Sequence, residues 1–391
     1  MRIGVDACCW SNRRGFGRFT RELLTALAKI DDRNEYRFFV DQQTAIENQF
    51  PKNITLVTVS TRVAPTQAAS SSGRRSISDL LRMTRSVAKH SIDLFFFPAI
   101  YSYFPVWNRA KIAVTIHDMT PARFARSIFP DKKLEFFWNL KEKIALHQSD
   151  RIVTVSQYSK QQIMEHRGIT ESRISVVSEA AGEAFQVLPE NEKRVEVLSR
   201  FGLTGNRYLL NVGGISPHKN LQALAKAFSQ LVQDPSFSEY KLVLAGDFEK
   251  DSFYSDYDVL QKLVEQLQIR NRIVFTGYID DEALAHLYNS AVLFVFPSLQ
   301  EGFGLPAVEA MACGTPIVAS DAGSLPEIIG DAGEFFDPDN SKQMLETIRR
   351  VLSDESLRHQ MRARGLERVK DFQWEKAARQ TLQIFESMIT S

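Results

Sequence analysis

The stretch Glu301-Gly-Phe-Gly-Leu-Pro-Ala-Val-Glu309 places a glutamate on either side of a proline, with seven residues between the two acids. Proline suits the first position of a helix, because its missing N–H would have no partner there. Gly314 follows shortly and is a natural helix stop. We therefore predict a short helix over Pro306–Cys313, whose N–H groups at the start can bind an anion such as a pyrophosphate.

The two glutamates lie in different surroundings. Glu301 belongs to the glycine-bearing loop before the helix, and Glu309 belongs to the helix itself. One carboxylate can therefore reach a sugar and the other a ribose, with phosphate between them. This arrangement favours a nucleotide-sugar as ligand.

Short apolar runs precede and follow this helix, and they alternate with amphipathic stretches along the whole chain. That alternation is typical of parallel sheets covered by helices. The amphipathic stretches include Phe19–Lys29, Phe136–Gln148 and Phe372–Ile389. The expected strands are Arg2–Ala7, Tyr36–Val40, Thr55–Val59, Leu94–Phe97, Lys111–Ile116, Arg151–Val155, Ile174–Val177, Tyr208–Val212, Lys241–Ala245, Ile273–Thr276, Val292–Phe296, Pro316–Ala319 and Gly333–Phe336.

The pattern starts again in the second half of the chain, and 391 residues are enough for two domains of ordinary size. We expect two Rossmann-like α/β domains with the changeover near Phe185–Pro189. Ligands of such sheets bind at the carboxyl ends of the strands.

Composition excludes several classes of protein. The formal net charge of +1 does not support nucleic-acid binding by bulk charge. The three cysteines, two of them neighbours (Cys8, Cys9), form no disulfide or zinc spacing. Prolines interrupt the most apolar stretch, Leu94–Trp107, which is too short to span a bilayer. The sequence opens on a strand without a secretion signal, and we expect a cytoplasmic protein with no nucleic-acid partner.

The segment Thr61–Ser91 is basic, with Asp79 as its single acid. We predict an amphipathic helix over Ile77–Lys89. Two interpretations stay open: a solvated surface, or a contact through residues 62–90 with an acceptor or with anionic lipids, which would place the protein peripherally on the membrane. The basic residues are Arg62, Arg74, Arg75, Arg82, Arg85 and Lys89.

The segment from Glu301 to Ser320 resembles the E-x7-E signature of glycosyltransferase family 4, the retaining "group 1" glycosyl transferases. The Gly-Phe-Gly-Leu-Pro core and the Ala-Cys-Gly-Thr-Pro-Ile exit both agree with it. Other matching stretches follow in the family's order, over essentially the whole chain. They are Gly15-Phe-Gly17, His117-Asp118, Pro217-His-Lys-Asn220 and Ala245-Gly-Asp247.

The resemblance implies the GT-B architecture, in which two Rossmann-like domains with parallel sheets face each other across a donor cleft. An N-terminal acceptor-side domain would span 1–187 and, through a last helix that crosses back, 373–391. A C-terminal nucleotide-sugar-binding domain would span 188–372. The implied reaction is the retaining transfer of a hexose from a nucleotide-diphosphate sugar to a glycan or lipid-linked acceptor in polysaccharide biosynthesis, without a cofactor.

The resemblance also assigns roles in the second half. Glu301 would accept hydrogen bonds from sugar hydroxyls and Glu309 from the ribose. Lys219, which follows a strand, would neutralise the departing pyrophosphate. The main-chain N–H groups that would hold sugar and phosphates belong to Gly302, Phe303, Gly304 and Leu305.

One position departs from the family. The loop after Tyr208–Val212 begins Gly213-Gly214, and the family commonly has an arginine where Gly214 stands. That arginine joins the lysine on the phosphates. His218 or the helix dipole at Pro306 would have to compensate.

In the first half the resemblance assigns His117, after the strand Lys111–Ile116, to the sugar 6-hydroxyl and the reacting centre. Asp118 would orient the loop or the acceptor. Tyr278 would meet the base, or would be a packed core aromatic. The loop expected to close on the pyrophosphate contains Gly15, Phe16 and Gly17.

No residue resembles a sugar nucleophile, so we expect front-face transfer in which the leaving phosphate takes the acceptor's proton. The D-x-D strings Asp256-Tyr-Asp258 and Asp337-Pro-Asp339 fall in a predicted helix and a turn. Neither lies at a strand end, and we expect no metal site.

Other functions compete with this one. Gly15-Phe-Gly17-Arg-Phe-Thr20 is an imperfect dinucleotide fingerprint, but it lacks the tight turn and the third glycine of a dehydrogenase. A nucleotide-sugar epimerase or a donor-binding, non-catalytic protein would share the donor residues. Among donors we expect UDP-glucose ahead of GDP-mannose.

Overall fold

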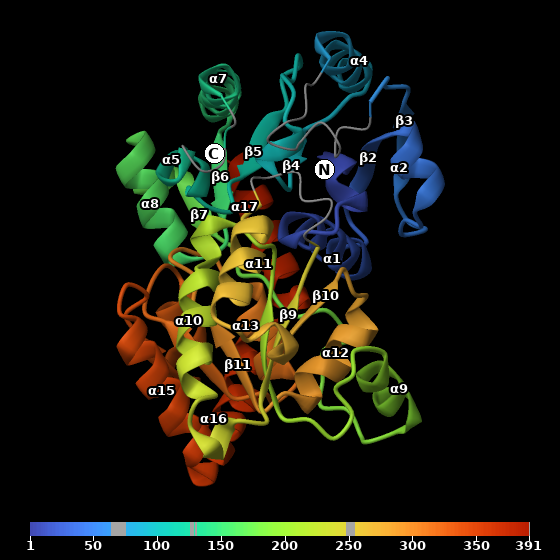
Figure 1. Cartoon of the computed structure of the whole chain (residues 1–391). Helices are drawn as coiled ribbons and strands as arrows, with labels where there is room; N and C mark the ends of the chain where they lie inside the picture. Colours follow the sequence, from blue (N-terminus) through green and yellow to red (C-terminus); the bar gives the residue numbers. More distant parts are fainter. Residues whose placement is uncertain (64–75, 126–128, 130, 248–254, 391) are drawn as a thin grey trace. The chain divides into compact units, whose positions relative to one another are not determined.

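In the computed structural model the chain forms two compact units (Figure 1). The structure describes residues 1–63, 76–125, 129, 131–247 and 255–390. Unit 1 contains Met1–Glu179 and Gln373–Ser391, and unit 2 contains Ala180–Phe372. Of the basic residues in segment 61–91, Arg74 and Arg75 lie outside the described residues.

The first boundary falls before the expected one at 187/188, because the intervening residues pack on unit 2. The Phe185 ring lies edge-on to Tyr288 at 5.9 Å. The Asn289 side chain accepts a hydrogen bond from the Leu188 N–H and donates one to the Gln186 carbonyl. These contacts fasten the segment to helix α12 (Asp281–Ser290).

Unit 1 is built on a parallel sheet with the strand order β3-β2-β1-β4-β5-β6-β7. The order reverses between β1 and β4, which makes this a doubly wound sheet. Each strand is a short apolar run of the kind that both faces of a parallel sheet bury. The strands are β1 (Arg2–Asp6), β2 (Glu35–Asp41), β3 (Thr55–Val59), β4 (Leu94–Phe97), β5 (Lys111–Thr115), β6 (Arg151–Thr154) and β7 (Ile174–Val176).

Alternate residues of β4 show which helices cover each face of this sheet. Phe95 and Phe97 share a core with side chains of α4 (Ile77–Ala88), α7 (Lys132–Gln148) and α8 (Gln157–Arg167). Phe96 points to the other face and meets Phe385 of α17 (Trp374–Thr390) at 5.2 Å. Helix α17 packs there beside α1 (Gly15–Ile30). The remaining described α-helices of unit 1 are α2 (Gln42–Glu47) and α5 (Thr120–Arg123).

Unit 2 repeats the plan with the strand order β10-β9-β8-β11-β12-β13, again entirely parallel. The order reverses between β8 and β11. The strands are β8 (Tyr208–Val212), β9 (Lys241–Ala245), β10 (Ile273–Gly277), β11 (Leu293–Phe296), β12 (Ile317–Ser320) and β13 (Gly333–Phe336). The helices besides α12 are α9 (Glu192–Arg200), α10 (Leu221–Leu231), α11 (Tyr257–Gln266), α13 (Leu305–Ala312), α14 (Leu325–Ile329), α15 (Ser341–Ser353) and α16 (Glu355–Arg368).

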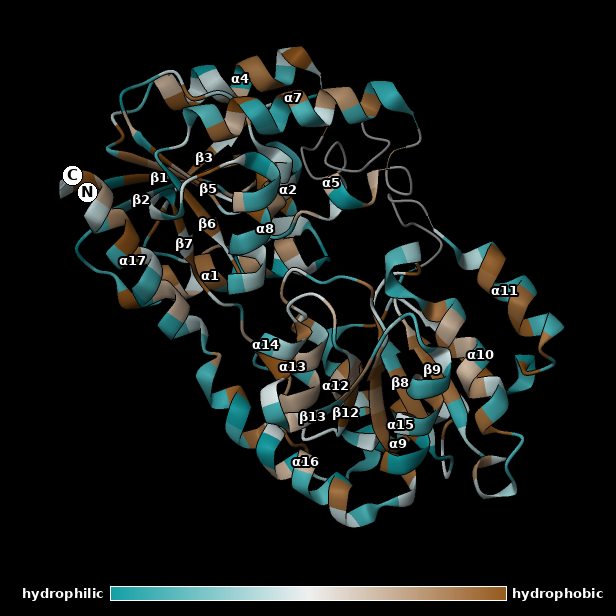
Figure 2. Cartoon of the chain, turned by 90° about the vertical axis from the view of Figure 1, so that its left-hand side faces the viewer, coloured by the Kyte–Doolittle hydropathy of each residue, from teal (hydrophilic) through white to brown (hydrophobic). Residues whose placement is uncertain are grey.

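The strands are the most apolar parts of the chain, and many helices turn an apolar side to them and a polar side outward (Figure 2). All the strands expected from the sequence are present, with ends within one residue of the expected ones. The parallel α/β class is therefore confirmed. Among the described residues, no helix has both the length and the hydropathy to cross a bilayer.

Candidate functional site

The strongest candidate site of unit 2 lies at the carboxyl ends of β8 and β11, where the strand order reverses. A short 3-10 turn after β8, Pro217–Lys219, carries the lysine, and the loop after β11 carries Glu301. The Lys219 Nζ donates to the Glu301 Oε1 at 2.6 Å, and both side chains are mostly buried. The fold therefore brings together two residues that the sequence proposed separately.

The Lys219 ammonium group is held between an aromatic ring and a carboxylate. It is 5.7 Å from the centre of the Phe296 ring, which ends β11. A lysine carries three N–H donors, and the bond to Glu301 uses one of them. The group can therefore donate to an anionic ligand while it stays attached to Glu301.

Glycines let the loops at this edge approach one another closely. A Cβ on Gly246 would lie 2.0 Å from the Gly213 carbonyl oxygen. The Gly213 N–H donates to the Ala245 carbonyl, and the Gly246 N–H donates to that of Gly277. The His218 carbonyl accepts from the Leu299 N–H at 2.8 Å, which ties the β8 loop to the β11 loop.

The loop between Glu301 and α13 is held by the start of α14. The Ser324 hydroxyl donates to the Phe303 carbonyl at 2.7 Å. The backbone of Gly304 has φ +97°, and a Cβ there would lie 2.7 Å from Leu325 Cδ2. Gly304 is also the N-cap of α13, and it has no side chain that could cap the first N–H groups of this helix.

Helix α13 begins at Leu305 and ends at Ala312, one residue earlier at each end than expected. Pro306 is therefore its second residue. Gly314 has φ +70°, as a helix stop requires. The binding of an anion at this helix start stays a prediction.

Glu309 lies inside α13 and is only 3% exposed. The Tyr288 hydroxyl donates to its Oε2 at 3.1 Å and lies 3.2 Å from the Pro306 carbonyl. A buried carboxylate needs such donors, because its desolvation is costly. Sequence reasoning missed Tyr288, which looks like one more apolar position of α12.

Tyr278 follows β10 and is 45% exposed. The interpretation as a packed core aromatic is therefore wrong. Its side chain lies beyond the carboxyl end of a strand that neighbours β9. The contact of Tyr278 with the base of a nucleotide stays a prediction.

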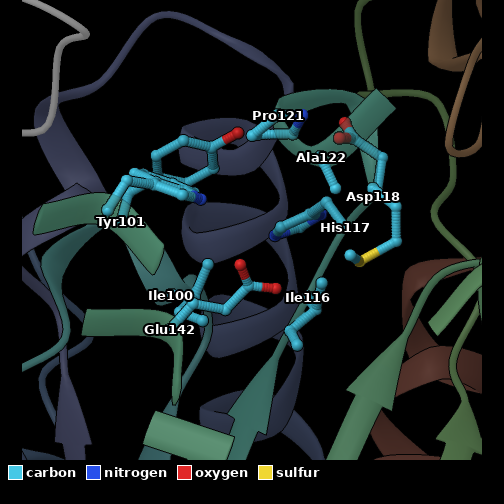
Figure 3. Close-up of a pocket in the computed structure, with 10 residues that line it drawn as sticks. Ile100, Tyr101, Ile116, His117, Asp118, Pro121, Ala122 and Glu142 are labelled. Atoms are coloured by element: carbon cyan, nitrogen blue, oxygen red, sulfur yellow. The ribbon is translucent and has the colours of Figure 1, made fainter. Parts of the chain in front are cut away.

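Unit 1 has its own pocket around His117, which follows β5 (Figure 3). The His117 Nε2 lies 3.0 Å from the Pro98 carbonyl, which can only accept, so Nε2 carries a proton. Nδ1 lies 3.2 Å from Glu179 Oε1. Asp118 accepts from the Thr120 N–H at 2.7 Å and so orients the loop, one of the two roles expected.

The pocket is small, about 10 Å³, which is room for one water molecule. Tyr101 and Trp138 line it together with His117. Outside it, Phe16 stacks on Tyr101 at 4.3 Å with 19° between the rings.

The residues Gly15, Phe16 and Gly17 form the first turn of α1 rather than a loop, which corrects the prediction. The helix begins before Phe19 because this turn packs tightly on the preceding segment. A Cβ on Gly17 would lie 2.0 Å from the Asn12 carbonyl oxygen. Gly17 is thus required by close backbone packing.

The predicted site residues accordingly fall into two groups on two units. Unit 1 holds His117 and the start of α1. The group in unit 2 comprises Gly213, Gly214, His218, Lys219, Tyr278, Glu301, Gly302, Phe303, Gly304, Leu305 and Glu309.

Comparison with known proteins gives matches in both halves of the chain. Residues 199–368 match the family model described as "Glycosyl transferases group 1", and residues 13–180 match "Glycosyltransferase Family 4". Serotype-specific mannosyltransferase WbdA of Escherichia coli is 31% identical over 284 residues, which are 72% of this chain and 34% of that protein. O-antigen chain mannosyltransferase B of Escherichia coli is 36% identical over 244 residues, 62% of each chain. This chain thus spans about a third of WbdA and less than two thirds of mannosyltransferase B.

Solved structures match the fold over the full length. Sucrose-phosphate synthase from Thermosynechococcus elongatus aligns with a TM-score of 0.76 at 19% identity, over 100% of this chain and 99% of the other. HepE from Anabaena, solved with UDP and glucose, aligns with a TM-score of 0.73 at 18% identity, over 99% of each chain. Together with the two parallel sheets, these matches identify the fold as GT-B, as the sequence predicts.

Proposed function

Because this chain belongs to the group 1, family 4 glycosyl transferases, we propose that it moves a hexose from a nucleotide-diphosphate sugar to a glycan or lipid-linked acceptor in polysaccharide biosynthesis. The observation that carries the proposal is the Lys219–Glu301 pair at the β8/β11 switch point, close in sequence to the uncapped start of α13. Nucleotides bind at such switch points in open α/β sheets.

Each group has a chemical task. As the bond from sugar to phosphate breaks, negative charge grows on the departing diphosphate. The Lys219 ammonium and the positive end of the α13 dipole stabilise that charge. Glu301 accepts hydrogen bonds from sugar hydroxyls, and its bond to Lys219 holds the cation beside the breaking bond.

Glu309 binds the ribose of the donor. The Tyr288 hydroxyl satisfies one of its oxygens and fixes the carboxylate. The other oxygen accepts from the ribose hydroxyls. A carboxylate positioned beforehand loses little entropy when the donor binds.

For His117 of unit 1 we keep the role that the family resemblance implies, contact with the sugar. The His117 ring is held by Pro98 and Glu179 and packs edge-on to Phe19 at 4.8 Å. Carboxylates do lie near it, because Asp118 and Glu142 line the same pocket and Glu179 pairs with Nδ1, and we assign them to holding the ring and the loop. The family resemblance implies retention, and we propose front-face transfer, in which the acceptor's proton passes to the leaving phosphate.

The sugar is proposed as mannose or glucose. The names of the relatives above 30% identity favour a mannosyl donor such as GDP-mannose, and the sequence alone favoured UDP-glucose. The epimerase loses support, because both family models describe glycosyl transferases.

A peripheral membrane contact through residues 62–90 also remains a proposal. The described basic residues Arg62, Arg82, Arg85 and Lys89 are all exposed, and Arg82 also lies 3.5 Å from the buried Asp79. Helix α4 therefore offers charge for anionic lipid phosphates.

A donor panel tests the function. We expect thermal stabilisation by one of UDP, GDP or ADP or their sugars, because a ligand bound to the folded state raises its stability. Lys219→Met should abolish the shift, and Lys226→Met, on the exposed side of α10, should preserve it. With the matching donor, release of nucleotide should depend on added acceptor.

Two outcomes contradict the proposal. The first is that no nucleotide or nucleotide-sugar shifts the melting temperature. The second is that Lys219→Met binds and turns over donor as wild type does. Conversion of the donor to another nucleotide-sugar without an acceptor would instead support the epimerase.

A further inference from the structure

Helix α7 carries an apolar stripe on its solvent side. Phe136, Phe137, Leu140 and Ile144 are exposed by 63%, 53%, 42% and 41%. Their spacing of three to four residues sets them on one side of the helix. Most large side chains of this kind lie in the core of the protein, so a cluster on one helix needs an explanation.

The stripe is not the core face of α7. The opposite side of the helix already packs inward through Ala145 and Leu146, which belong to the core under the sheet. Glu142 is also buried there and pairs with Arg167 at 2.7 Å. In both views α7 lies at the outer edge of unit 1 (Figures 1 and 2).

Positive charge surrounds the stripe. Lys132, Lys133 and Lys143 are exposed, whereas Glu135 is half-buried and Glu142 is buried, and the exposed Asp131 caps the start of the helix. Helix α4 differs, because its apolar residues Met83 and Val87 are used in the core. Of the large apolar side chains of α4 only Ile77 is exposed, so the four-residue stripe is a feature of α7 and not of α4.

We propose that this face of α7 docks on the surface of an anionic lipid bilayer. The phenylalanines and the aliphatic side chains enter the boundary between headgroups and acyl chains, and the lysines bind lipid phosphates. Charge complementarity favours this occupant over a second copy of the chain. A symmetric pairing of two such faces would bring like-charged lysines together.

The proposal does not depend on glycosyl transfer, and it differs from the contact through residues 62–90 because it uses apolar insertion. Its test is flotation of the full chain, without donor, on vesicles of phosphatidylcholine with and without phosphatidylglycerol. We expect the chain to bind the anionic vesicles only, and to bind them less as salt rises.

Variants locate the contact. Phe136→Ser/Phe137→Ser should weaken partition at least tenfold, and Lys132→Gln/Lys133→Gln by about fivefold for each lysine removed. Ile46→Ser is the matched control, since Ile46 is an exposed apolar residue on α2 of the same unit, and it should bind as wild type. Melting curves must show that each variant is folded.

Three outcomes would overturn the proposal: no flotation with anionic vesicles, unchanged flotation of the α7 variants, or loss of binding in Arg85→Gln/Lys89→Gln alone, which assigns the contact to α4. Light scattering tests the remaining alternative, a dimer formed through this face of α7. A dimer in wild type that Phe136→Ser/Phe137→Ser dissolves would show that the face binds a second copy.

Discussion

At the scale of single residues, the two glutamates of the signature are held in different ways. Glu301 pairs with the Lys219 cation at a loop edge. Glu309 is enclosed in a helix and held by the neutral Tyr288 hydroxyl. The first arrangement suits a group that must respond to changing charge, and the second suits a fixed binding group.

Tyr288→Phe tests the second arrangement. The change removes the donor to Glu309 and leaves a buried carboxylate with one fewer partner, a loss of about 1–3 kcal/mol. We expect donor affinity to fall roughly tenfold, because the carboxylate is no longer positioned. Titration of the matching nucleotide by calorimetry measures this.

Tyr208→Phe is the control for that experiment. The Tyr208 hydroxyl donates to the Leu287 carbonyl at 2.7 Å, and burial raises the pKa of Tyr208, so it stays a donor. Its loss should cost similar stability but leave nucleotide affinity unchanged. Equal affinity losses in both variants would contradict a special role for Tyr288.

The sequence could single out Glu301, Lys219 and Glu309 as candidates because each lies in a short stretch that resembles the family's signature. It could not predict Tyr288 as the partner of Glu309. That contact joins two helices, and neither contains a pattern that names the other.

At the scale of elements, strands were predictable to within a residue, as were the starts of α4 and α13, but the starts of α1 and α7 were each missed by four residues. A buried parallel strand is apolar throughout, and polar residues mark both its ends. Helix α7 begins at Lys132, four residues before the expected Phe136. The prediction missed this first turn because the turn is mostly polar and lacks the apolar spacing of the rest of the helix. The missed signal is Asp131, whose carboxylate accepts from the N–H groups of Lys133 and Leu134.

Gly304→Ala tests the loop before α13. A side chain there is strained at φ +97° and crowds Leu325, so we expect a loss of about 2–4 kcal/mol in the free energy of unfolding. Donor binding should fall as well, because the turn aligns the start of the helix. Urea unfolding measures the first effect and calorimetry the second.

Gly205→Ala is the matched substitution. Gly205 has φ +71°, but a Cβ there would meet no atom within 4 Å. We expect a cost of only about 1–2 kcal/mol and unchanged donor binding. A Gly304 variant no worse than the Gly205 variant would show that crowding by Leu325 does not fix the loop.

At the scale of the whole molecule, unit 1 is built from two separate stretches of the chain, the first 179 residues and the last helix. Two units with separate cores were expected from the repeated pattern. The boundary at Glu179 was not expected, because residues 180–187 have no clear secondary-structure pattern and their place in unit 2 is set by contacts with α12. The last helix, α17, completes the first unit through Phe385 and Trp374.

This arrangement gives each unit its own probe. All the tryptophans, Trp10, Trp107, Trp138 and Trp374, belong to unit 1, so their fluorescence reports on that unit alone. In unit 2 the only cysteine is Cys313, and burial raises the pKa of its thiol. It should therefore react with thiol reagents only when unit 2 opens.

Phe385→Ala and Phe228→Ala then form a reciprocal pair. Both rings are buried, one in α17 of unit 1 and the other in α10 of unit 2, and each truncation should cost about 3–5 kcal/mol. We expect Phe385→Ala to shift the tryptophan transition in urea and leave Cys313 labelling in place, and Phe228→Ala to do the reverse. A single transition that moves both signals together in both variants would mean that the units unfold as one, and α17 would then stabilise the whole chain rather than the unit it completes.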